Sequence, residues 1–392
     1  MSKILNVSLI FLLSIIHFPM AQAGENSLPA PWDLGMLRQA PVFSLEGPPS
    51  STEDIQAIKY EGSPLRGAST SVFAYVGVPK IATKIPGVVL VHGGGGKAQE
   101  RWVRLWNKRG FAAISLDTRG SGQWDKSFEQ TDEPVVDQWP FRTVANIVKA
   151  RALLASLPGV DGERIGITGI SWGGYLTCIA AGVEPKFAFA APVYGCGFLG
   201  EDSVWVPTLA KIGPEKAARW LKLWDPSEYL PRVRMPMLWV DGNTDFAYPI
   251  SSLQKSYRLP LGERWLCMRP GMSHGHQPGE NPEEIGVFAS QVVAGGEPLV
   301  RCNKQGIDQH LLWAEFSVSG TSTLVKAQCA YTASIGPYDK RTWKVETAQL
   351  EAKSRASFAL PAGTTAAFLF VTDERNLVAS CEHITLELTE KP

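Results

Sequence analysis

The 392-residue sequence has no excess of charge of either sign, and after its N-terminal segment it has no apolar run long enough to cross a membrane. Its 38 Lys and Arg residues balance 38 Asp and Glu residues, whereas proteins that bind nucleic acid through its phosphates usually carry a basic excess. We therefore expect no nucleic-acid partner. Apolar residues make up 44% and charged residues 19% of the chain, which is typical of a folded globular protein. The length predicts about two to three structural units.

The N-terminus resembles a secretory signal peptide. Lys3 supplies a positive charge, residues 4–16 form an apolar run, and Ala21-Gln22-Ala23 is a small-residue cleavage pattern before Gly24. The run is shorter than the roughly 20 residues that span a bilayer. The sequence therefore predicts a signal peptide over residues 1–23, no membrane anchor after its cleavage, and an exported protein, periplasmic or secreted.

Cysteine is scarce, with six residues in the chain. An even number of cysteines in an oxidising compartment permits disulfides, although a chain of this length can build a core without them. Cys329 and Cys381 lie in strand-like segments near the C-terminus and are the pair we favour for a disulfide. Cys178 lies in an apolar helical pattern and is expected to be a buried free thiol.

Six short, continuous apolar runs alternate with helical patterns along most of the chain. Apolar residues that do not alternate with polar ones indicate strands buried on both faces, as in a parallel sheet covered by helices. Residues 141–157 fit a crossover helix, and residues 58–60 and 71–78 are predicted to pair as antiparallel strands that open the sheet. The predicted fold class is α/β, with a doubly wound, mostly parallel sheet. The six predicted buried strands are residues 87–91, 111–116, 164–168, 187–193, 236–240 and 265–268.

The chain is predicted to divide into an arm, an α/β domain and a β module. Residues 24–55 are rich in Pro, Gly and Ser and are expected to form an extended arm on the surface. Residues 56–295 form the α/β domain, with a helical insertion at about 196–232. Residues 296–392 contain strand patterns at short spacing and predict a small all-β, sandwich-like module. Its expected strands are residues 311–318, 323–332, 355–360, 366–371 and 377–388.

The sequence Gly169-Ile170-Ser171-Trp172-Gly173 joins a predicted strand to a predicted helix. The pattern G-x-S-x-G at such a turn is typical of a nucleophile elbow, in which the serine hydroxyl is exposed above the edge of a sheet. Glycine is needed on either side because the turn is too tight for side chains. By itself the pattern is also common in ordinary glycine-rich turns, so neighbouring motifs decide its meaning.

A run of four glycines, 93–96, follows His92 at the end of another predicted strand. Such a loop exposes backbone N–H groups, which can stabilise the oxyanion of an acyl-transfer reaction. We expect Gly94 and Gly95 to contribute to this oxyanion hole, with the N–H of Trp172 as a further donor. A phosphate-binding loop is excluded because Lys97 is not followed by Ser or Thr.

Candidates for a general base and its acid partner follow the last two predicted strands of the sheet. Asp241 and Asp245 follow the strand at 236–240, and Asp245, past the glycine turn, is the favoured acid, although Asp241 remains an alternative. His274 is the favoured base because Gly275 leaves room for its ring, with His276 as the alternative. His274 and His276 lack a third ligand at a recognisable spacing, so we expect no metal and no organic cofactor.

The order Ser171, Asp245, His274 resembles that of the α/β-hydrolase superfamily. Residues 56–295 are closest to its prolyl-oligopeptidase-like and acetyl-xylan-esterase-like branches. The resemblance implies a serine carboxylic-ester hydrolase that works through an acyl-enzyme. It rests on His92 to Gly96, Asp117 to Gly122, the turn at Ser171, Gly242 to Asp245, and His274-Gly275.

The substrate is predicted less directly than the reaction. The insertion at 196–232 is expected to cap the site, and its Trp205, Trp220 and Trp224 suit either stacking on sugars or packing of the cap. Together with export, the resemblance favours an esterase that removes acetyl or a similar small acyl group from polysaccharide. The alternatives are an exported serine peptidase and a catalytically silent glycan-binding protein. About 30 residues precede the predicted sheet, whereas peptidases of this branch generally carry a large N-terminal propeller.

Overall fold

The computed structural model describes residues 28–47, 55–80, 83–121, 124–318, 322–351 and 354–386. The predicted signal peptide, residues 1–23, lies outside them. No helix in these described ranges is long and apolar enough to cross a membrane.

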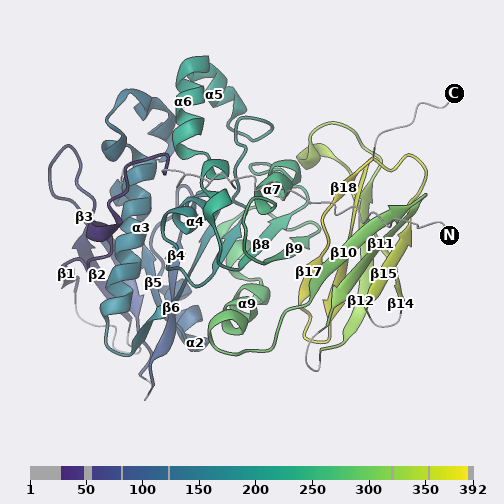
Figure 1. The fold of residues 1–392 in the computed structure, drawn as a ribbon, viewed down its shortest axis with the longest axis horizontal. Helices are drawn as coiled ribbons and strands as arrows, with labels where there is room; N and C mark the ends of the chain where they lie inside the picture. Colours follow the sequence, from purple (N-terminus) through teal and green to yellow (C-terminus); the bar gives the residue numbers. More distant parts are fainter. Residues whose placement is uncertain are drawn as a thin grey trace, which may run out of the picture.

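A mixed sheet of nine strands lies at the centre of the part of the chain that is described (Figure 1). Its strands are β1 (Phe43–Leu45), β2 (Ile55–Glu61), β3 (Ser71–Gly77), β4 (Ile85–Val91), β5 (Ala112–Leu116), β6 (Val160–Ile170), β7 (Ala190–Val193), β8 (Met237–Gly242) and β9 (Arg264–Arg269). They lie in the order β1-β2-β3-β5-β4-β6-β7-β8-β9. Strands β4 to β9 pair in parallel, and β1 to β3 form an antiparallel edge. Every residue of β4, β5 and β8 is buried, as expected for strands covered on both faces. The predicted α/β fold is confirmed.

Helices between the strands cover this sheet. They are α2 (Glu100–Lys108), α3 (Trp139–Ser156), α4 (Trp172–Val183), α7 (Ile250–Tyr257), α8 (His276–Glu280) and α9 (Glu283–Val293). The crossover helix α3 is buried over most of its length. The insertion after β7 contains the helices α5 (Val206–Ile212) and α6 (Pro214–Trp224), which stand above the sheet (Figure 1). Trp220 and Trp224 are fully buried, so both of them pack the cap. The shorter 3₁₀ segments are η1 (Thr118–Ser121), η2 (Trp124–Asp132), η3 (Val135–Asp137), η4 (Pro226–Glu228), η5 (Leu230–Arg232) and η6 (Tyr338–Lys340).

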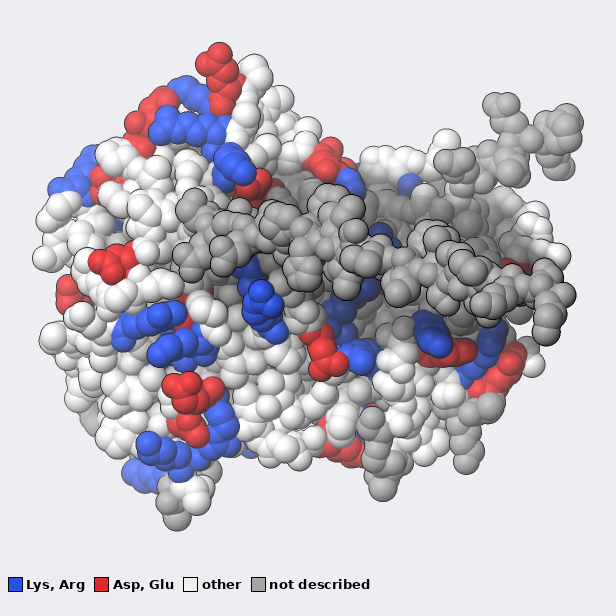
Figure 2. Space-filling view, in the orientation of Figure 1, with Lys and Arg blue, Asp and Glu red and all other residues white. Residues whose placement is uncertain are grey.

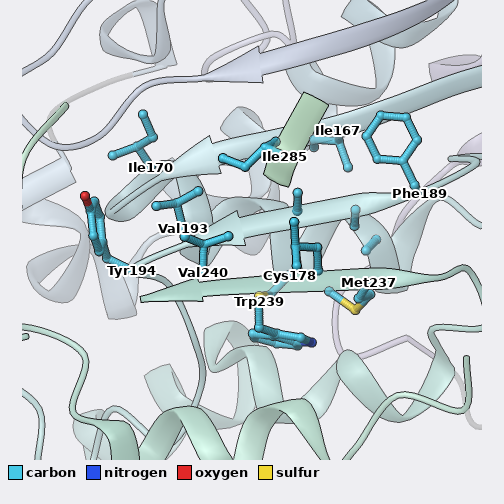
Figure 3. Close-up of a cluster of buried hydrophobic side chains, with 14 of the residues drawn as sticks. Ile167, Ile170, Cys178, Phe189, Val193, Tyr194, Met237, Trp239, Val240 and Ile285 are labelled. Atoms are coloured by element: carbon cyan, nitrogen blue, oxygen red, sulfur yellow. The ribbon is translucent and has the colours of Figure 1, made fainter. Parts of the chain in front are cut away.

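The central parallel strands end side by side. Ile170, the last residue of β6, is the register partner of Val193 in β7, and Val193 is the partner of Val240 in β8. Figure 3 shows these side chains in one apolar cluster, with Tyr194 at its end. Because parallel strands all end at one edge, the loops that follow them converge there.

The predicted arm is only partly an extended segment. Its described residues, 28–47, contain the short helix α1 (Leu34–Leu37) and the strand β1, which pairs with β2 at the edge of the sheet. Trp32 stacks on Phe141 of α3 at a centroid distance of 4.4 Å. The arm is therefore anchored by apolar packing as well as by strand pairing.

The C-terminal region consists of two antiparallel sheets (Figure 1). One has the order β10-β11-β15-β14 and the other β13-β12-β16-β17, with β18 also paired to β16. Burial alternates along β11, as in a sandwich strand with one face in the core. The prediction missed β10, β13 and β14 and joined β17 and β18 into one strand. The strands are β10 (Arg301–Asp308), β11 (Leu311–Ser317), β12 (Leu324–Thr332), β13 (Lys344–Thr347), β14 (Gln349–Glu351), β15 (Arg355–Ala359), β16 (Ala366–Asp373), β17 (Val378–Ser380) and β18 (Ile384–Thr385).

The predicted disulfide between Cys329 and Cys381 is wrong. All six cysteines are free, and Cys178 is buried as expected. Cys329 of β12 pairs with Leu369 of β16, and the N–H of Cys381 bonds the carbonyl of Leu369 from the other side. One strand therefore separates the two cysteines, and two strand spacings of about 4.8 Å exceed the reach of a disulfide.

Candidate active site

Ser171 lies at the turn between β6 and α4. Its backbone has φ 58° and ψ −121°, which is a strained conformation for a residue with a side chain. The turn is held by the N–H of Ser171, which donates to the carbonyl of Val193 at 2.9 Å, and by the N–H of Tyr175, which donates to the carbonyl of Ser171 at 2.9 Å. The strained conformation thus presents the serine hydroxyl at the edge of the sheet where the strands end.

Glycine is required at two positions of this turn. A Cβ atom at Gly169 would lie 2.2 Å from the carbonyl oxygen of Gly173, and one at Gly173 would lie 2.0 Å from the carbonyl oxygen of Val91. Both distances are far below van der Waals contact with backbone atoms. The predicted reason for the G-x-S-x-G spacing is therefore visible as close backbone packing.

The structure brings Ser171, His274 and Asp245 together. His274 Nε2 lies 2.8 Å from the Oγ of Ser171, and His274 Nδ1 lies 2.6 Å from an Oδ of Asp245. With Asp245 ionised, Nδ1 carries the proton and Nε2 is free to accept the hydrogen of the serine hydroxyl. The imidazole also packs against the ring of Tyr194 at 4.7 Å, which fixes its plane.

Asp245 is held for this role by the turn that follows β8. Its other carboxylate oxygen accepts the N–H groups of Ala247 and Tyr248, each at 2.8 Å, and the residue is 2% exposed. Of the two aspartates considered from the sequence, this one reaches His274.

Asp241 is buried at the end of β8, with one oxygen accepting the N–H of Gly242 at 2.7 Å. Burial, and then the nearby charge of Asp245, raise the pKa of Asp241 well above its ordinary value. Asp241 therefore holds its proton more tightly than an ordinary aspartate does.

His276 points away from Ser171. Its ring meets Trp102 edge to face at 5.1 Å, and its Nδ1 lies within ion-pair distance of Glu280. His274 has both ring nitrogens engaged by Ser171 and Asp245, so the two histidines do not share a ligand site. Within the described residues no group of three or more His, Cys, Asp or Glu side chains is arranged to hold a metal ion.

The glycine run after β4 lies beside the serine. A Cβ atom at Gly93 would be 3.0 Å from that of Ser171, and Gly94 and Trp172 line the cavity in front of Ser171. Gly95, with φ 70°, forms the turn of the loop and is not part of the described cavity lining. The loop therefore passes close enough to Ser171 for Gly94 to face a bound acyl group.

His92 has a structural task that the sequence did not reveal. It is buried, its Nε2 accepts the N–H of Thr118 at 3.0 Å, and its Nδ1 lies 2.7 Å from the carbonyl of Gly93. Because Nε2 is an acceptor, the proton sits on Nδ1 and donates to Gly93. His92 thus ties the glycine loop to the segment after β5, which includes Asp117 and Thr118.

An open cavity of about 510 Å³ lies over Ser171 and His274. Its walls come from η2, the segment before α5, and the turn after Asp245, and sequence reasoning assigned none of them except Trp205 to a site. The further lining residues are Asp125, Phe128, Val204, Trp205, Thr208, Phe246 and Ala247. The site therefore combines a hydrogen-bonded serine, histidine and aspartate with a cavity that is apolar over most of its wall.

Known proteins resemble this chain in sequence pattern and in fold. Residues 99–258 match the model of the prolyl oligopeptidase family. The fold of the chain is similar to that of α/β-hydrolases. No curated protein sequence matches it closely enough to be a recognisable relative.

Solved structures with a similar fold include esterases and peptidases. Acetyl xylan esterase 1 from Thermoanaerobacterium sp. JW/SL YS485 is 18% identical with a TM-score of 0.54, covering 68% of this chain and 94% of that chain. The acetyl xylan esterase from Paenibacillus sp. R4 is 18% identical with a TM-score of 0.53, covering 66% and 92%. The Pyrococcus horikoshii acylaminoacyl peptidase is 20% identical with a TM-score of 0.50, covering 66% and 44%. At these identities the similarity shows the fold alone.

Proposed function

We propose that this α/β-hydrolase is an exported serine carboxylic-ester hydrolase that acts on ester-substituted carbohydrate, in the manner of an acetyl xylan esterase. The observation that carries the proposal is the continuous relay from Ser171 through His274 to Asp245 at the base of an open cavity. A catalytically silent glycan-binding protein would have no need of this relay.

The relay accounts for the steps of ester hydrolysis. His274 takes the hydroxyl proton as Ser171 Oγ attacks the ester carbonyl, and Asp245 stabilises the imidazolium that forms. The N–H groups of Gly94 and Trp172 bind the oxyanion. His274 then protonates the departing alcohol, and water, activated by the same histidine, releases the acid and restores Ser171.

Carbohydrate esters are favoured over peptides because the two acetyl xylan esterases match this chain over nearly their whole length. The family model and the acylaminoacyl peptidase keep a peptidase as the second candidate. Export rests on the charge of Lys3, the apolar run and the cleavage pattern before Gly24, and an N-terminal sequence of the mature protein starting at Gly24 would support it.

A substrate panel tests the proposal. Acetylated xylan and p-nitrophenyl acetate are compared with aminoacyl and dipeptidyl p-nitroanilides, and Ser171→Ala serves as the control in each assay. We expect release of acetate that is lost in the variant by a factor of about a million. Faster turnover of the peptidyl substrates would assign the site to a peptidase, and acetate release by Ser171→Ala would refute the nucleophile.

A further inference from the structure

The cavity over Ser171 is far larger than an acetyl group. It measures about 510 Å³, whereas an acetyl group is little larger than two or three water molecules, each of which takes about 30 Å³ of liquid volume. A second part of the substrate must therefore enter the cavity if it is to be filled.

Part of the cavity wall is formed by packed aromatic rings. The ring of Trp172 contacts Trp205 at a centroid distance of 4.8 Å and Phe128 at 6.0 Å, both edge to face. All three residues line the cavity and are almost completely buried. Such a wall favours a flat aromatic group, which packs against ring edges in the geometry that aromatic pairs prefer.

Polar side chains are few in this wall. Apart from Ser171 and His274, the described lining residues with polar side chains are Asp125 and Thr208. A sugar ring carries several hydroxyl groups, and each that is buried without a partner costs free energy. The cavity therefore suits a largely apolar group with one or two hydroxyls better than it suits a sugar.

The alcohol and the acyl group of an ester would lie on different sides of the site, the alcohol at His274 and the acyl group at the aromatic wall. The alcohol oxygen must lie at His274, which protonates it, and Phe246 beside His274 is 53% exposed, with ring centroids 5.0 Å apart. The alcohol side is therefore open to solvent and to a large carbohydrate. The acyl side faces Trp172, the residue after the nucleophile, and hence the aromatic wall.

We propose that the cavity binds an aromatic acyl group that carries a ring hydroxyl, of the hydroxycinnamoyl or hydroxybenzoyl class, against Phe128, Trp172 and Trp205. Asp125 is exposed at the cavity, and among the described residues no hydrogen bond or ion pair occupies its carboxylate, which accepts the ring hydroxyl of the substrate. This inference rests on the proposed function and extends its acyl group beyond acetyl. The Ser171 oxygen forms the new bond to the acyl carbon, the ester bond to the alcohol breaks, the alcohol leaves with the proton from His274, and water then yields the free aromatic acid.

Three methyl esters with the same alcohol test the proposal: methyl acetate, methyl cinnamate and methyl 4-hydroxycinnamate. We expect kcat/KM to be at least tenfold higher for methyl 4-hydroxycinnamate than for methyl acetate, although conjugation makes its carbonyl less reactive. A higher kcat/KM for methyl acetate would overturn the aromatic acyl site while leaving the proposed esterase intact. Absence of Ser171-dependent hydrolysis of p-nitrophenyl acetate would instead refute the esterase itself.

Two variants locate the acyl group. Val204→Trp fills the cavity from its rim, where Val204 is 44% exposed, and should lower the ratio of cinnamate to acetate kcat/KM at least fivefold. Val325→Trp, at an exposed position of β12 outside the cavity, is the matched control and should keep the ratio. An unchanged ratio in Val204→Trp would contradict the proposal.

Asp125→Asn tests the hydroxyl contact. It should reduce the ratio of 4-hydroxycinnamate to cinnamate kcat/KM several-fold, mainly through KM, because a neutral amide is a weaker acceptor than a carboxylate. A ratio equal to that of the unsubstituted protein would remove Asp125 from the proposal.

Discussion

The central sheet and the C-terminal sandwich bury their strands in different ways, and the functional groups follow from that difference. In β4 and β5 every residue is buried, whereas in β11 buried residues alternate with more exposed ones. Parallel strands all end at one edge, where the turns carrying Ser171, Asp245 and His274 meet. Consecutive antiparallel strands end at opposite edges, so the loops of the sandwich are divided between its two ends. The shared edge of the parallel strands thus explains why the candidate site lies in the nine-stranded sheet.

The sandwich is nevertheless joined to the strand that leads to His274. Ser380 of the sandwich accepts the N–H of Met268 in β9 at 3.0 Å. The fully buried carboxylate of Glu284 accepts from Arg269, at the end of β9, and from the N–H of Val378 at 2.6 Å. The second region therefore supports the position of the loop that carries the base.

The largest expected effect separates the two aspartates at the end of β8. Asp245→Asn should lower kcat for p-nitrophenyl acetate about ten-thousand-fold, because the amide leaves His274 in the wrong tautomer. Asp241→Asn should lower it less than about tenfold, since Asp245 is the aspartate that bonds His274. The reverse ranking in steady-state assays would move the acid to Asp241.

Acid should weaken the sandwich through His383. Burial, and then the charges of Arg258 and Arg341, lower the pKa of His383 to about 4. The unfolded chain, with an ordinary histidine pKa of about 6.5, then binds more protons between these values, so stability falls as the pH drops from about 6.5 to 4. His383→Gln should remove up to about 3 kcal/mol of the stability lost between pH 7 and pH 4, as measured by urea unfolding at both pH values.

The exposed His310, in the turn between β10 and β11, provides the control for this measurement. His310→Gln should leave unchanged the difference in the free energy of unfolding between pH 7 and pH 4. An equal acid loss in the His383 variant and the unsubstituted protein would show that His383 does not cause it.

The contact between the central sheet and the sandwich should be stabilised by the buried carboxylate of Glu284. Glu284→Gln removes the charge that Arg269 faces and should lower the free energy of unfolding by roughly 1–3 kcal/mol. Glu263→Gln breaks a pair with Arg301 in which the carboxylate is 63% exposed, and should cost less than about 1 kcal/mol. If chemical denaturation showed equal losses in the free energy of unfolding for the two variants, Glu284 would not stabilise this contact.

The smallest expected effect is a gain of stability in the central sheet. The pKa of Asp241 is raised by folding, so the folded state holds this proton more tightly than the unfolded chain. The stability that this proton supplies is complete below the ordinary aspartate pKa of about 3.9 and is lost as the pH rises above it. Asp241→Asn should therefore raise Tm by a few degrees at pH 7, with the gain vanishing near pH 4. A lower Tm at pH 7 would contradict this.

The two regions also differ in how well the sequence predicted them. All six buried strands of the parallel sheet were predicted because a strand that is covered on both faces requires an unbroken apolar run. The sequence of β10 (Arg301–Asp308) is mostly polar and half exposed, so no apolar pattern marked it. The predicted Cys329–Cys381 disulfide was wrong because strand order within a sheet is a tertiary property. Strand β16 lies between the two cysteines.

The same contrast holds within the site. The glycines around Ser171 and the histidine loop are recognisable in the sequence because the backbone there tolerates few residue types. The choice between Asp241 and Asp245 depended on which carboxylate could reach His274, which is a matter of turn geometry. The cavity walls at Phe128, Val204 and Phe246 come from three separated segments with no common spacing, so only their assembly in space revealed them.

Covalent labelling tests the activation of Ser171 by His274 most directly, and the proposed chemistry depends on that activation. The protein is treated with a fluorophosphonate, and the adduct is located by peptide mass spectrometry in the unsubstituted chain and in His274→Ala. We predict one adduct per chain, on the peptide that contains Ser171, and labelling at least a hundredfold slower in the variant. An adduct on another residue, or labelling of Ser171 at the same rate without His274, would contradict the relay.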